Sequence, residues 1–556
     1  MNSKISLKER ARKVPPPQPP VPSVTSIHDS FQPVFSYLVR PLWRGILIQD
    51  LLILVLSMLL AAQLWGENLS AKFGLFDDHE IISYLGVRSS LPLSDAINIF
   101  KSTEALHPGD TNRYRPSYYF LRCFEAYLWG DSPQLWYMSR MAMFVVTVSI
   151  AWTLLARCCG FGLSSLLILF SLRAPYWALI WAVLGPSETY ACLGVAIYFL
   201  GVFLCWGREA SWNTVGWSLI LTGILISAGS KENFTLLVIP TFLLLLRQYR
   251  LGELRWKTAP FALAGIGFCL FVVNAARVGA NRIKQDTYAQ PVDAGRFKPL
   301  LAEIALPNPV MWALVLILCC FLCLYLAEKN QESRKEIWRW AGYAVFAEAV
   351  LFGTYLALIF FYYGKWQHNS RYAFPGELIQ LAMFAYPLIT FFKLPRIASQ
   401  PNISLFKAGL IVVGIIWQLE LGFEGNIQYA RTSALKTNAL QDIILKCKKI
   451  GADNPASPIV LYSQNLEDYE PLFAVKSYLV HTGMKNPIML EMAEDFRNGA
   501  FTALMAPALL KSLRTLEEGA SGFTPLNSMS EHQVCYYVAF TVAPKSTRCL
   551  VASVIK

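Results

Sequence analysis

Long apolar segments recur along this chain and constrain its fold more than any other feature. A helix needs about 20 apolar residues to cross a bilayer. Segments that approach or exceed this length lie near residues 45–65, 135–157, 163–184, 187–206, 213–230, 233–247, 258–277, 309–327, 340–363, 375–392 and 406–422. Only 15% of the 556 residues are charged, against about 25% in soluble domains. The sequence therefore predicts an all-α polytopic membrane bundle of about eleven transmembrane helices.

Basic residues gather in the short connections on one side of these segments. They are Arg157, Arg208, Arg247, Arg250, Arg255, Lys257, Lys329, Arg334, Lys335, Arg339, Lys393, Arg396 and Lys407, and the N-terminal Lys4, Lys8, Arg10, Arg12 and Lys13. The positive-inside rule then places the N-terminus in the cytoplasm, and an odd number of spans places the C-terminal region outside. The net charge of +12 is explained by this topology. No basic stripe interleaved with aromatic residues points to nucleic acid.

The chain divides into three regions on this reading. Residues 1–44 form a disordered cytoplasmic tail, because "KVPPPQPPVPSV" is rich in proline. Residues 45–422 form the transmembrane domain, with a long first outer loop at 66–134. Residues 423–556 are expected to form a small α/β extracytoplasmic domain, in which "SPIVLYS" and "CYYVAFTV" have the composition of strands. The membrane is expected to be a bacterial inner membrane.

Most of the twelve cysteines lie inside the apolar segments, where they are expected to serve packing. Cys447, Cys535 and Cys549 fall in the predicted outer domain. An oxidising compartment permits one disulfide there, and Cys535 with Cys549 is the pair that we expect. The sequence does not contain two CxxC pairs at the spacing of a structural metal site.

Ionisable residues of the predicted outer face form the candidate site. The stretch "GLFDDHEIISYLG" begins just after the first apolar segment and contains four adjacent polar residues. The full set is Asp77, Asp78, His79, Glu80, Arg113, Arg115, Glu188, Lys231, Glu232, His368 and Arg371. Ionisable groups at membrane depth are costly and are kept mostly where they serve a site or a pathway. Their convergence on one face therefore predicts a substrate-binding or catalytic site.

Carboxylates beside basic groups suit transfer of a group from a lipid phosphate. A carboxylate can act as a general base, and the acidic pair is also compatible with a divalent metal ion. Arginine and lysine can hold a phosphate and stabilise its charge as it leaves. We expect Asp77 or Asp78 to be the base, and Arg113, Arg115, Lys231 or Arg371 to hold the phosphate.

The acidic pair after the first apolar segment resembles the GT-C superfamily of membrane glycosyltransferases. The pair lies in "FDDHE", and "RYRPSYYFLRCFEAYLWGD" resembles the amphipathic part of the same loop in bacterial members. The similarity is to the protein O-mannosyltransferase and aminoarabinose transferase group. It implies a GT-C-like fold and transfer of a sugar from a polyprenyl-phosphate carrier with inversion. The family pair is often Asp-Glu and here it is Asp-Asp, so the choice of base stays open. The WWD motif of oligosaccharyltransferases is absent.

The sequence thus predicts a membrane glycosyltransferase that uses a polyprenyl-phosphate-linked sugar and a lipid, glycan or protein acceptor. The alternative is a lipid or polysaccharide exporter of the cell envelope, which would use the same charges as a vestibule. A scaffold for envelope assembly is a third reading. Asp77 or Asp78 can instead cap the helix that follows. Lys231 and Glu232 can simply pair with each other.

Overall fold

The computed structural model describes most of the chain between residues 45 and 492, and two short strands beyond it. The described residues are 45–74, 78–103, 105–107, 114–206, 213–250, 258–282, 309–363, 401–453, 455–456, 459–463, 469–492, 536–542 and 548–550, with parts of 378–391. The tail at 1–44, Asp77, Arg113, His368, Arg371 and Cys535 lie outside the described residues. The expectations placed on them stay predictions.

Among the residues that the structure describes, four helices are long and apolar enough to cross a membrane, judged by length and composition. They correspond to α2 (Gly45–Trp65), α6 (Pro133–Cys159), α9 (Glu188–Trp206) and α12 (Ala259–Arg282). The other long helices are α10 (Asn213–Ser230), α11 (Val238–Arg250), α14 (Pro309–Ala327), α15 (Gln331–Tyr363), α18 (Pro401–Leu421) and α19 (Glu424–Asp453). The protein is therefore mainly helical and has the character of a membrane protein.

Two of the predicted spans are interrupted in the structure. The segment expected as one helix at 163–184 forms α7 (Phe161–Leu172) and the short α8 (Tyr176–Trp181). Pro175 lies between them, and a proline has no backbone N–H with which to continue a helix. The segment expected at 233–247 begins with a 3-10 helix, η3 (Glu232–Leu237), before α11 starts. The second break carries Lys231 and Glu232 of the candidate site.

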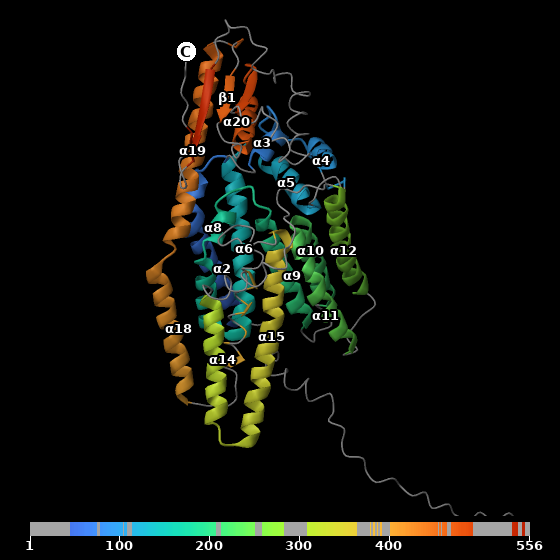
Figure 1. Ribbon diagram of the computed structural model, residues 1–556, viewed down its shortest axis with the longest axis vertical. Helices are drawn as coiled ribbons and strands as arrows, with labels where there is room; N and C mark the ends of the chain where they lie inside the picture. Colours follow the sequence, from blue (N-terminus) through green and yellow to red (C-terminus); the bar gives the residue numbers. More distant parts are fainter. Residues whose placement is uncertain are drawn as a thin grey trace, which may run out of the picture.

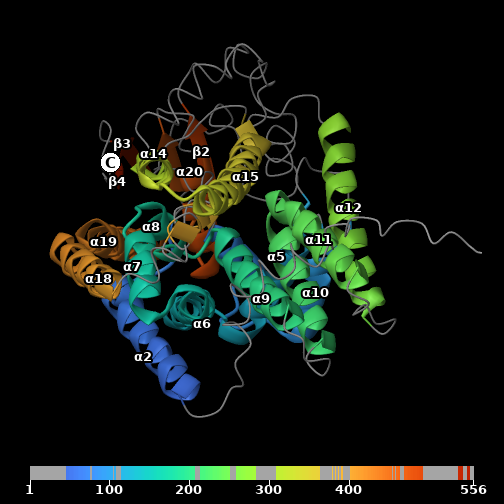
Figure 2. The same cartoon turned by 90° about the horizontal axis from the view of Figure 1, so that it is seen from below.

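The helices α2, α6, α9, α10 and α12 pack side by side in that order (Figure 2). Glycines bring α9 and α10 close together. A Cβ atom on Gly194 would lie 2.6 Å from Ser227 N, and one on Gly223 would lie 2.6 Å from Gly194 O. No residue larger than glycine fits these positions without a shift of the helices. This close approach places the start of α9, with Glu188, beside the end of α10, with Lys231.

The first loop and the C-terminal segment share one end of the molecule (Figure 1). The loop contains η2 (Gly66–Ser70), α3 (His79–Leu85), α4 (Leu93–Ser102) and α5 (Pro116–Trp129). Its buried Ile81 and Leu85 belong to one apolar cluster with Leu461 and Leu479 of the C-terminal segment. The Lys72 amide donates to Thr437 Oγ1 of α19 at 2.9 Å. Because they pack together, the loop and this segment lie on the same side of any membrane that α2 crosses.

A four-stranded sheet lies within the C-terminal segment. The strands are β1 (Ile459–Ser463), β2 (Ile488–Met492), β3 (Tyr536–Val542) and β4 (Arg548–Leu550), in the order β2-β1-β3-β4. β1 pairs in parallel with β2 and β3, and β4 is antiparallel to β3. The helix α20 (Tyr469–His481) connects β1 to β2. β1 and β3 coincide with the two stretches read as strands. The domain limits and the side of the membrane stay predictions.

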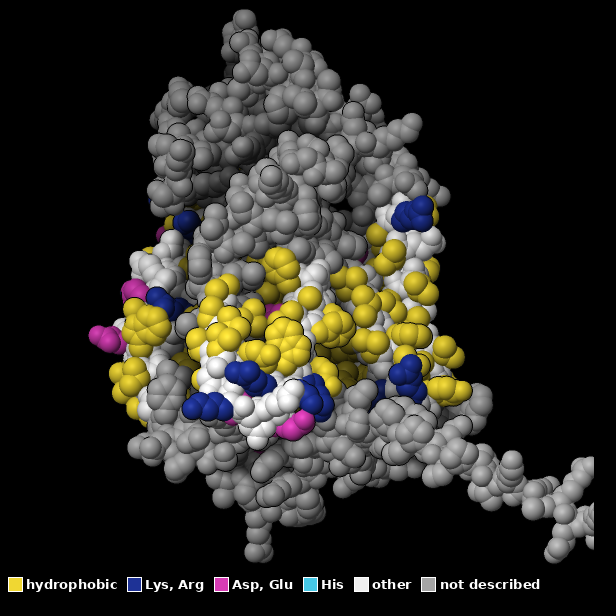
Figure 3. Space-filling view, turned by 60° about the horizontal axis from the view of Figure 1, so that its bottom comes forward, with side chains coloured by type: hydrophobic (Ala, Val, Ile, Leu, Met, Phe, Trp, Pro, Cys, Tyr) yellow, Lys and Arg dark blue, Asp and Glu magenta, His cyan; other side chains and the backbone are white. Residues whose placement is uncertain are grey.

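Basic side chains gather at the end opposite the first loop. Figure 3 shows Lys and Arg side chains below a broad band of hydrophobic ones on this face. Around the turn between α14 and α15, Lys329, Lys335 and Arg339 are exposed. Nearby in the fold, Arg157 at the end of α6 pairs with Asp50 of α2 at 2.6 Å. The positive-inside rule predicts such a distribution for a cytoplasmic end.

Candidate functional site

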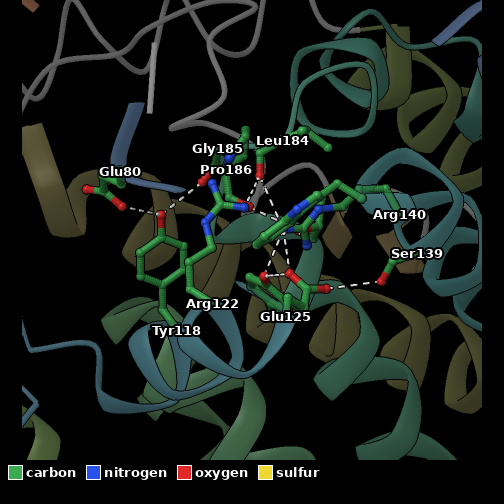
Figure 4. A network of polar contacts seen from close by, with 12 residues as sticks. Glu80, Tyr118, Arg122, Glu125, Ser139, Arg140, Leu184, Gly185 and Pro186 are labelled. Carbon is green, nitrogen blue, oxygen red and sulfur yellow. Dashed lines mark hydrogen bonds and ion pairs between the residues drawn. The ribbon is translucent and has the colours of Figure 1, made fainter. Parts of the chain in front are cut away.

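A buried polar network lies where the first loop meets α6 and the start of α9 (Figure 4). Arg140 of α6 is 1% exposed. Its guanidinium donates to Thr189 Oγ1 at 2.8 Å, to the Tyr190 hydroxyl at 2.7 Å and to the Leu184 carbonyl at 3.2 Å. It also forms an ion pair with Glu125 of α5 at 3.3 Å. One buried cation thus ties α5, α6 and α9 together.

Glu125 is the anion of this network. Its Oε1 accepts from Ser139 Oγ at 3.1 Å, and its Oε2 accepts from Arg140 and from the Tyr190 hydroxyl. A buried carboxylate that lacks donors costs several kcal/mol. Here hydrogen-bond donors surround it, so the charge is kept at low cost and the three elements are held in one arrangement.

Arg122 is a second, fully buried cation beside this pair. It is 0% exposed, and its Nη1 donates to the Leu184 carbonyl at 2.7 Å. Its guanidinium lies 5.7 Å from the Tyr118 ring centre and 5.4 Å from the Trp136 ring centre. Burial lowers the pKa of Arg122, but nearby acidic groups, Tyr118 first and Asp78 among them, outweigh it and raise the pKa well above its ordinary value. Arg122 therefore carries a permanent positive charge under the first loop.

Asp78 lies close to that charge and is 2% exposed. Its Oδ2 accepts a hydrogen bond from the Gly74 amide at 2.7 Å, and the Gly74 carbonyl accepts one from the Tyr478 hydroxyl. Burial raises the pKa of Tyr478 well above its ordinary value, and the Asp78 charge raises it further. Asp78 is thus enclosed between the first loop and α20, and it interacts electrostatically with Arg122.

Asp78 holds the N-cap position of α3, but its side chain does not make a capping hydrogen bond. The cap reading is therefore wrong for this aspartate, because its carboxylate is turned toward Gly74 instead. The other two residues of the acidic stretch lie in the first turn of α3. His79 is half-buried. The Tyr118 hydroxyl lies 3.1 Å from Glu80 Oε2 and 3.2 Å from the Gly185 carbonyl.

Two further ion pairs lie next to this network. Lys231 pairs with Glu188, and both are at most 3% exposed. Arg115 lies 3.5 Å from Glu232 Oε1, which also accepts from the Tyr114 amide at 3.0 Å. Lys231 has an extended backbone and Glu232 begins η3. Each of the two has a partner on another element, Glu188 for Lys231 and Arg115 for Glu232, and the suggested pairing of Lys231 with Glu232 stays a prediction.

The Lys231–Glu188 pair gives a first testable prediction. We expect Glu188→Gln and Lys231→Met to be non-additive, with a coupling of about 0.5–3 kcal/mol in a double-mutant cycle. The reason is that each single change leaves the other charge buried. The measurement is thermal unfolding of the four purified proteins in detergent. The exposed pair Arg88–Asp95, with side-chain exposures of 46% and 37%, serves as the control and should couple by less than about 1 kcal/mol. Equal coupling in both cycles would contradict the burial argument.

The structure brings together six of the predicted residues that it describes. Asp78, Glu80, Arg115, Glu188 and the adjoining Lys231–Glu232 step all contact the first loop, the segment 184–188 or η3. Sequence reasoning missed the centre of the network, Glu125, Arg140, Tyr118 and Tyr190. Arg140 gave a signal, since it is an ionisable residue within a predicted span. Among the described residues, no group of three or more His, Cys, Asp or Glu side chains is placed to hold a metal ion.

Comparisons with known proteins give one structural likeness. No protein-family model matches the chain, and no curated protein matches it. A solved structure, "Crystal Structure of ArnT from Cupriavidus metallidurans bound to Undecaprenyl phosphate", is similar at 13% sequence identity and a TM-score of 0.43. The match covers 87% of this chain and 92% of that chain. A likeness at this level carries no argument about function, which has to come from the site itself.

Proposed function

We propose that the protein is a membrane glycosyltransferase with a GT-C-like fold. It moves a sugar from a polyprenyl-phosphate-linked donor to a lipid, glycan or protein acceptor at the extracytoplasmic face. The observation that carries the proposal is the enclosure of Asp78 beside the permanently charged Arg122. Asp78 follows the first span closely and Arg122 lies on α5 of the first loop, and both are at the end where the first loop meets α6, α9 and the C-terminal segment. A side chain that exchanges a proton with the acceptor of a lipid-linked sugar has to lie at such a place, next to the bilayer.

The reaction assigns a role to each charge. An aspartate of the pair Asp77-Asp78 takes the proton of the acceptor hydroxyl. The acceptor oxygen bonds to the anomeric carbon, the bond from that carbon to the phosphate oxygen breaks, and the lipid phosphate leaves with the electron pair. Positive charge near the leaving phosphate lowers the barrier. Asp78 and Arg122 also stabilise each other's charge, which keeps the carboxylate ready as a base.

The phosphate is most simply held by basic groups that have no carboxylate partner. Lys231 is paired with Glu188, and Arg115 with Glu232. The two cations are therefore less available to a phosphate than the sequence suggested. Arg113 and Arg371 stay candidates on sequence grounds. Arg122 has two buried nitrogens, Nε and Nη2, without a hydrogen-bond partner in the described part of the chain. We therefore add Arg122 to the groups that stabilise the phosphate charge, acting through the field rather than through contact.

The proposal is tested with the full chain in lipid nanodiscs. Polyprenyl phosphates that carry a hexose, an N-acetylhexosamine or an aminopentose are supplied with a membrane extract as acceptor, and released polyprenyl phosphate is measured. We expect release from one donor class by the wild type and none by the Asp77→Asn/Asp78→Asn double variant. Full activity in that double variant would contradict the base assignment. Movement of the intact donor across the bilayer without release would favour the exporter.

A further inference from the structure

One carboxylic acid, Glu348, lies within the predicted membrane region of α15 and takes no part in the proposed sugar transfer. Glu348 is the single Asp, Glu, Lys, Arg or His between Trp340 and Tyr363. With a rise of about 1.5 Å per residue, it lies about 13 Å along the helix from Arg339 and about 22 Å from Tyr363. It is thus far from both ends of the apolar stretch.

Both carboxylate oxygens of Glu348 are buried, and neither has a hydrogen-bond partner in the part of the chain that the structure describes. Glu348 follows Ala344 by one turn and precedes Tyr355 by two, so the three share a helical face. Ala344 is 0% exposed and Tyr355 is 1% exposed. The carboxyl group therefore lies on the packed face of α15, away from the water at the surfaces of the membrane.

The neighbours of this face are apolar. Ala344 belongs to a cluster with Phe321 of α14, and Leu388 and Phe391 pack against the same cluster. An ionised carboxylate placed there without donors or a counter-ion costs several kcal/mol. The neutral acid costs much less, because only a polar group has to be desolvated.

We propose that Glu348 is a proton-binding site inside the membrane region, occupied at neutral pH. The ligand is the proton itself, and the site belongs to the packing of α15 against α14 and the segment 378–391. When the proton is lost at alkaline pH, the charge requires water or a cation, and α15 must move from its neighbours to admit it. The site is independent of the transfer chemistry proposed above.

Other titratable groups on the packed elements have to be considered in any pH dependence. Tyr343 lies on α15 itself, and Tyr386 of the 378–391 segment interacts electrostatically with Glu348. The helix α14 carries Cys319, Cys320, Cys323 and Tyr325, Glu328 directly follows it, and η3 carries Glu232. Glu232 is already paired with Arg115. The variants below change Glu348 alone, so the contributions of these groups cancel in the comparison.

The deciding experiment compares the thermal stability of wild type and Glu348→Gln from about pH 6 to about pH 9. Glutamine stands for the neutral acid at every pH. If the folded protein holds a proton that the unfolded chain releases, folding stability falls as pH rises. We expect the melting temperature of the wild type to fall relative to that of Glu348→Gln as the pH rises from about 6, and the difference to level off once the folded protein also loses the proton. A difference that does not change with pH would overturn the proposal.

A second measurement uses dicyclohexylcarbodiimide, which enters bilayers and adds to protonated carboxyl groups to form an N-acylurea. Mass spectrometry of the peptides should show Glu348 labelled at neutral pH, with labelling that falls about tenfold for each pH unit above its titration midpoint. Glu332 and Glu336 on the same helix are exposed and serve as internal controls that stay unlabelled. Labelling of Glu348 by a water-soluble carbodiimide, to the same extent as Glu332, would show that it is hydrated and would overturn the proposal.

Discussion

Replacing Arg140 with methionine is expected to destabilise the protein by about 3–5 kcal/mol, the cost of breaking a buried ion pair from one side. The change removes the hydrogen bonds to Thr189, Tyr190 and the Leu184 carbonyl. It also leaves the Glu125 carboxylate, 8% exposed, without its cation. Because these groups come from α5, α6 and α9, the loss affects the junction of the first loop with the spans.

The measurement follows thermal unfolding in detergent with a dye that fluoresces on reaction with thiols. The chain supplies the reporters, since Cys123, Cys192, Cys205, Cys269 and Cys447 are free and buried. The matched control is Arg88→Met, which breaks an exposed pair in the same loop and should cost less than about 1 kcal/mol. Adding Glu125→Gln to Arg140→Met should recover part of the loss, because it removes the stranded charge. Equal destabilisation by Arg88→Met and Arg140→Met would contradict the role of burial.

Much of this arrangement could be expected from the sequence. Hydrophobic length located α2, α6, α9 and α12, because a bilayer demands about 20 apolar residues whatever the packing. The same reasoning gathered Glu188, Lys231 and Arg115 at one end, since Glu188 and Lys231 stand at boundaries of apolar segments and Arg115 lies in the predicted outer loop. The side of the membrane on which these residues are predicted to lie follows from the number of spans that precede them. That number does not depend on side-chain contacts.

The pairing of those charges could not be predicted, because it depends on distances set by the fold. Glu188 reaches Lys231 because glycines let α9 and α10 approach closely. Glu232 turns to Arg115 because η3 begins at that residue. The sequence suggests only the adjacent residue as a partner, because the residues that the fold brings near are far away along the chain.

The core of the network was missed for a related reason. Glu125 and Arg140 are 15 residues apart, on two helices joined by a short turn. The sequence pattern around Glu125 is that of an exposed residue on an amphipathic helix. Glu125 becomes buried only because α6 and Tyr190 of α9 pack against it. Long-range packing, rather than local pattern, decides whether such a charge faces water or an ion-pair partner.

Asp78→Asn is the variant with the largest expected effect on activity. We expect the initial rate of sugar transfer to fall by about 10²–10⁴, the usual contribution of a general base. Asparagine keeps an oxygen that can accept from the Gly74 amide, as the Asp78 carboxylate does. The fold should therefore be retained, and the melting temperature should stay near that of the wild type. The measurement is release of polyprenyl phosphate at saturating donor.

The control is Asp95→Asn, which removes another acid of the first loop. Asp95 is exposed and paired with Arg88, so its loss should leave the rate unchanged. Comparison with Asp77→Asn then separates the two aspartates. A rate that falls in Asp77→Asn and not in Asp78→Asn makes Asp77 the base and leaves Asp78 as its buried neighbour. The enclosure of Asp78 beside Arg122 argues for the opposite result, because the fixed positive charge keeps the carboxylate ionised and the packing around it holds it in place.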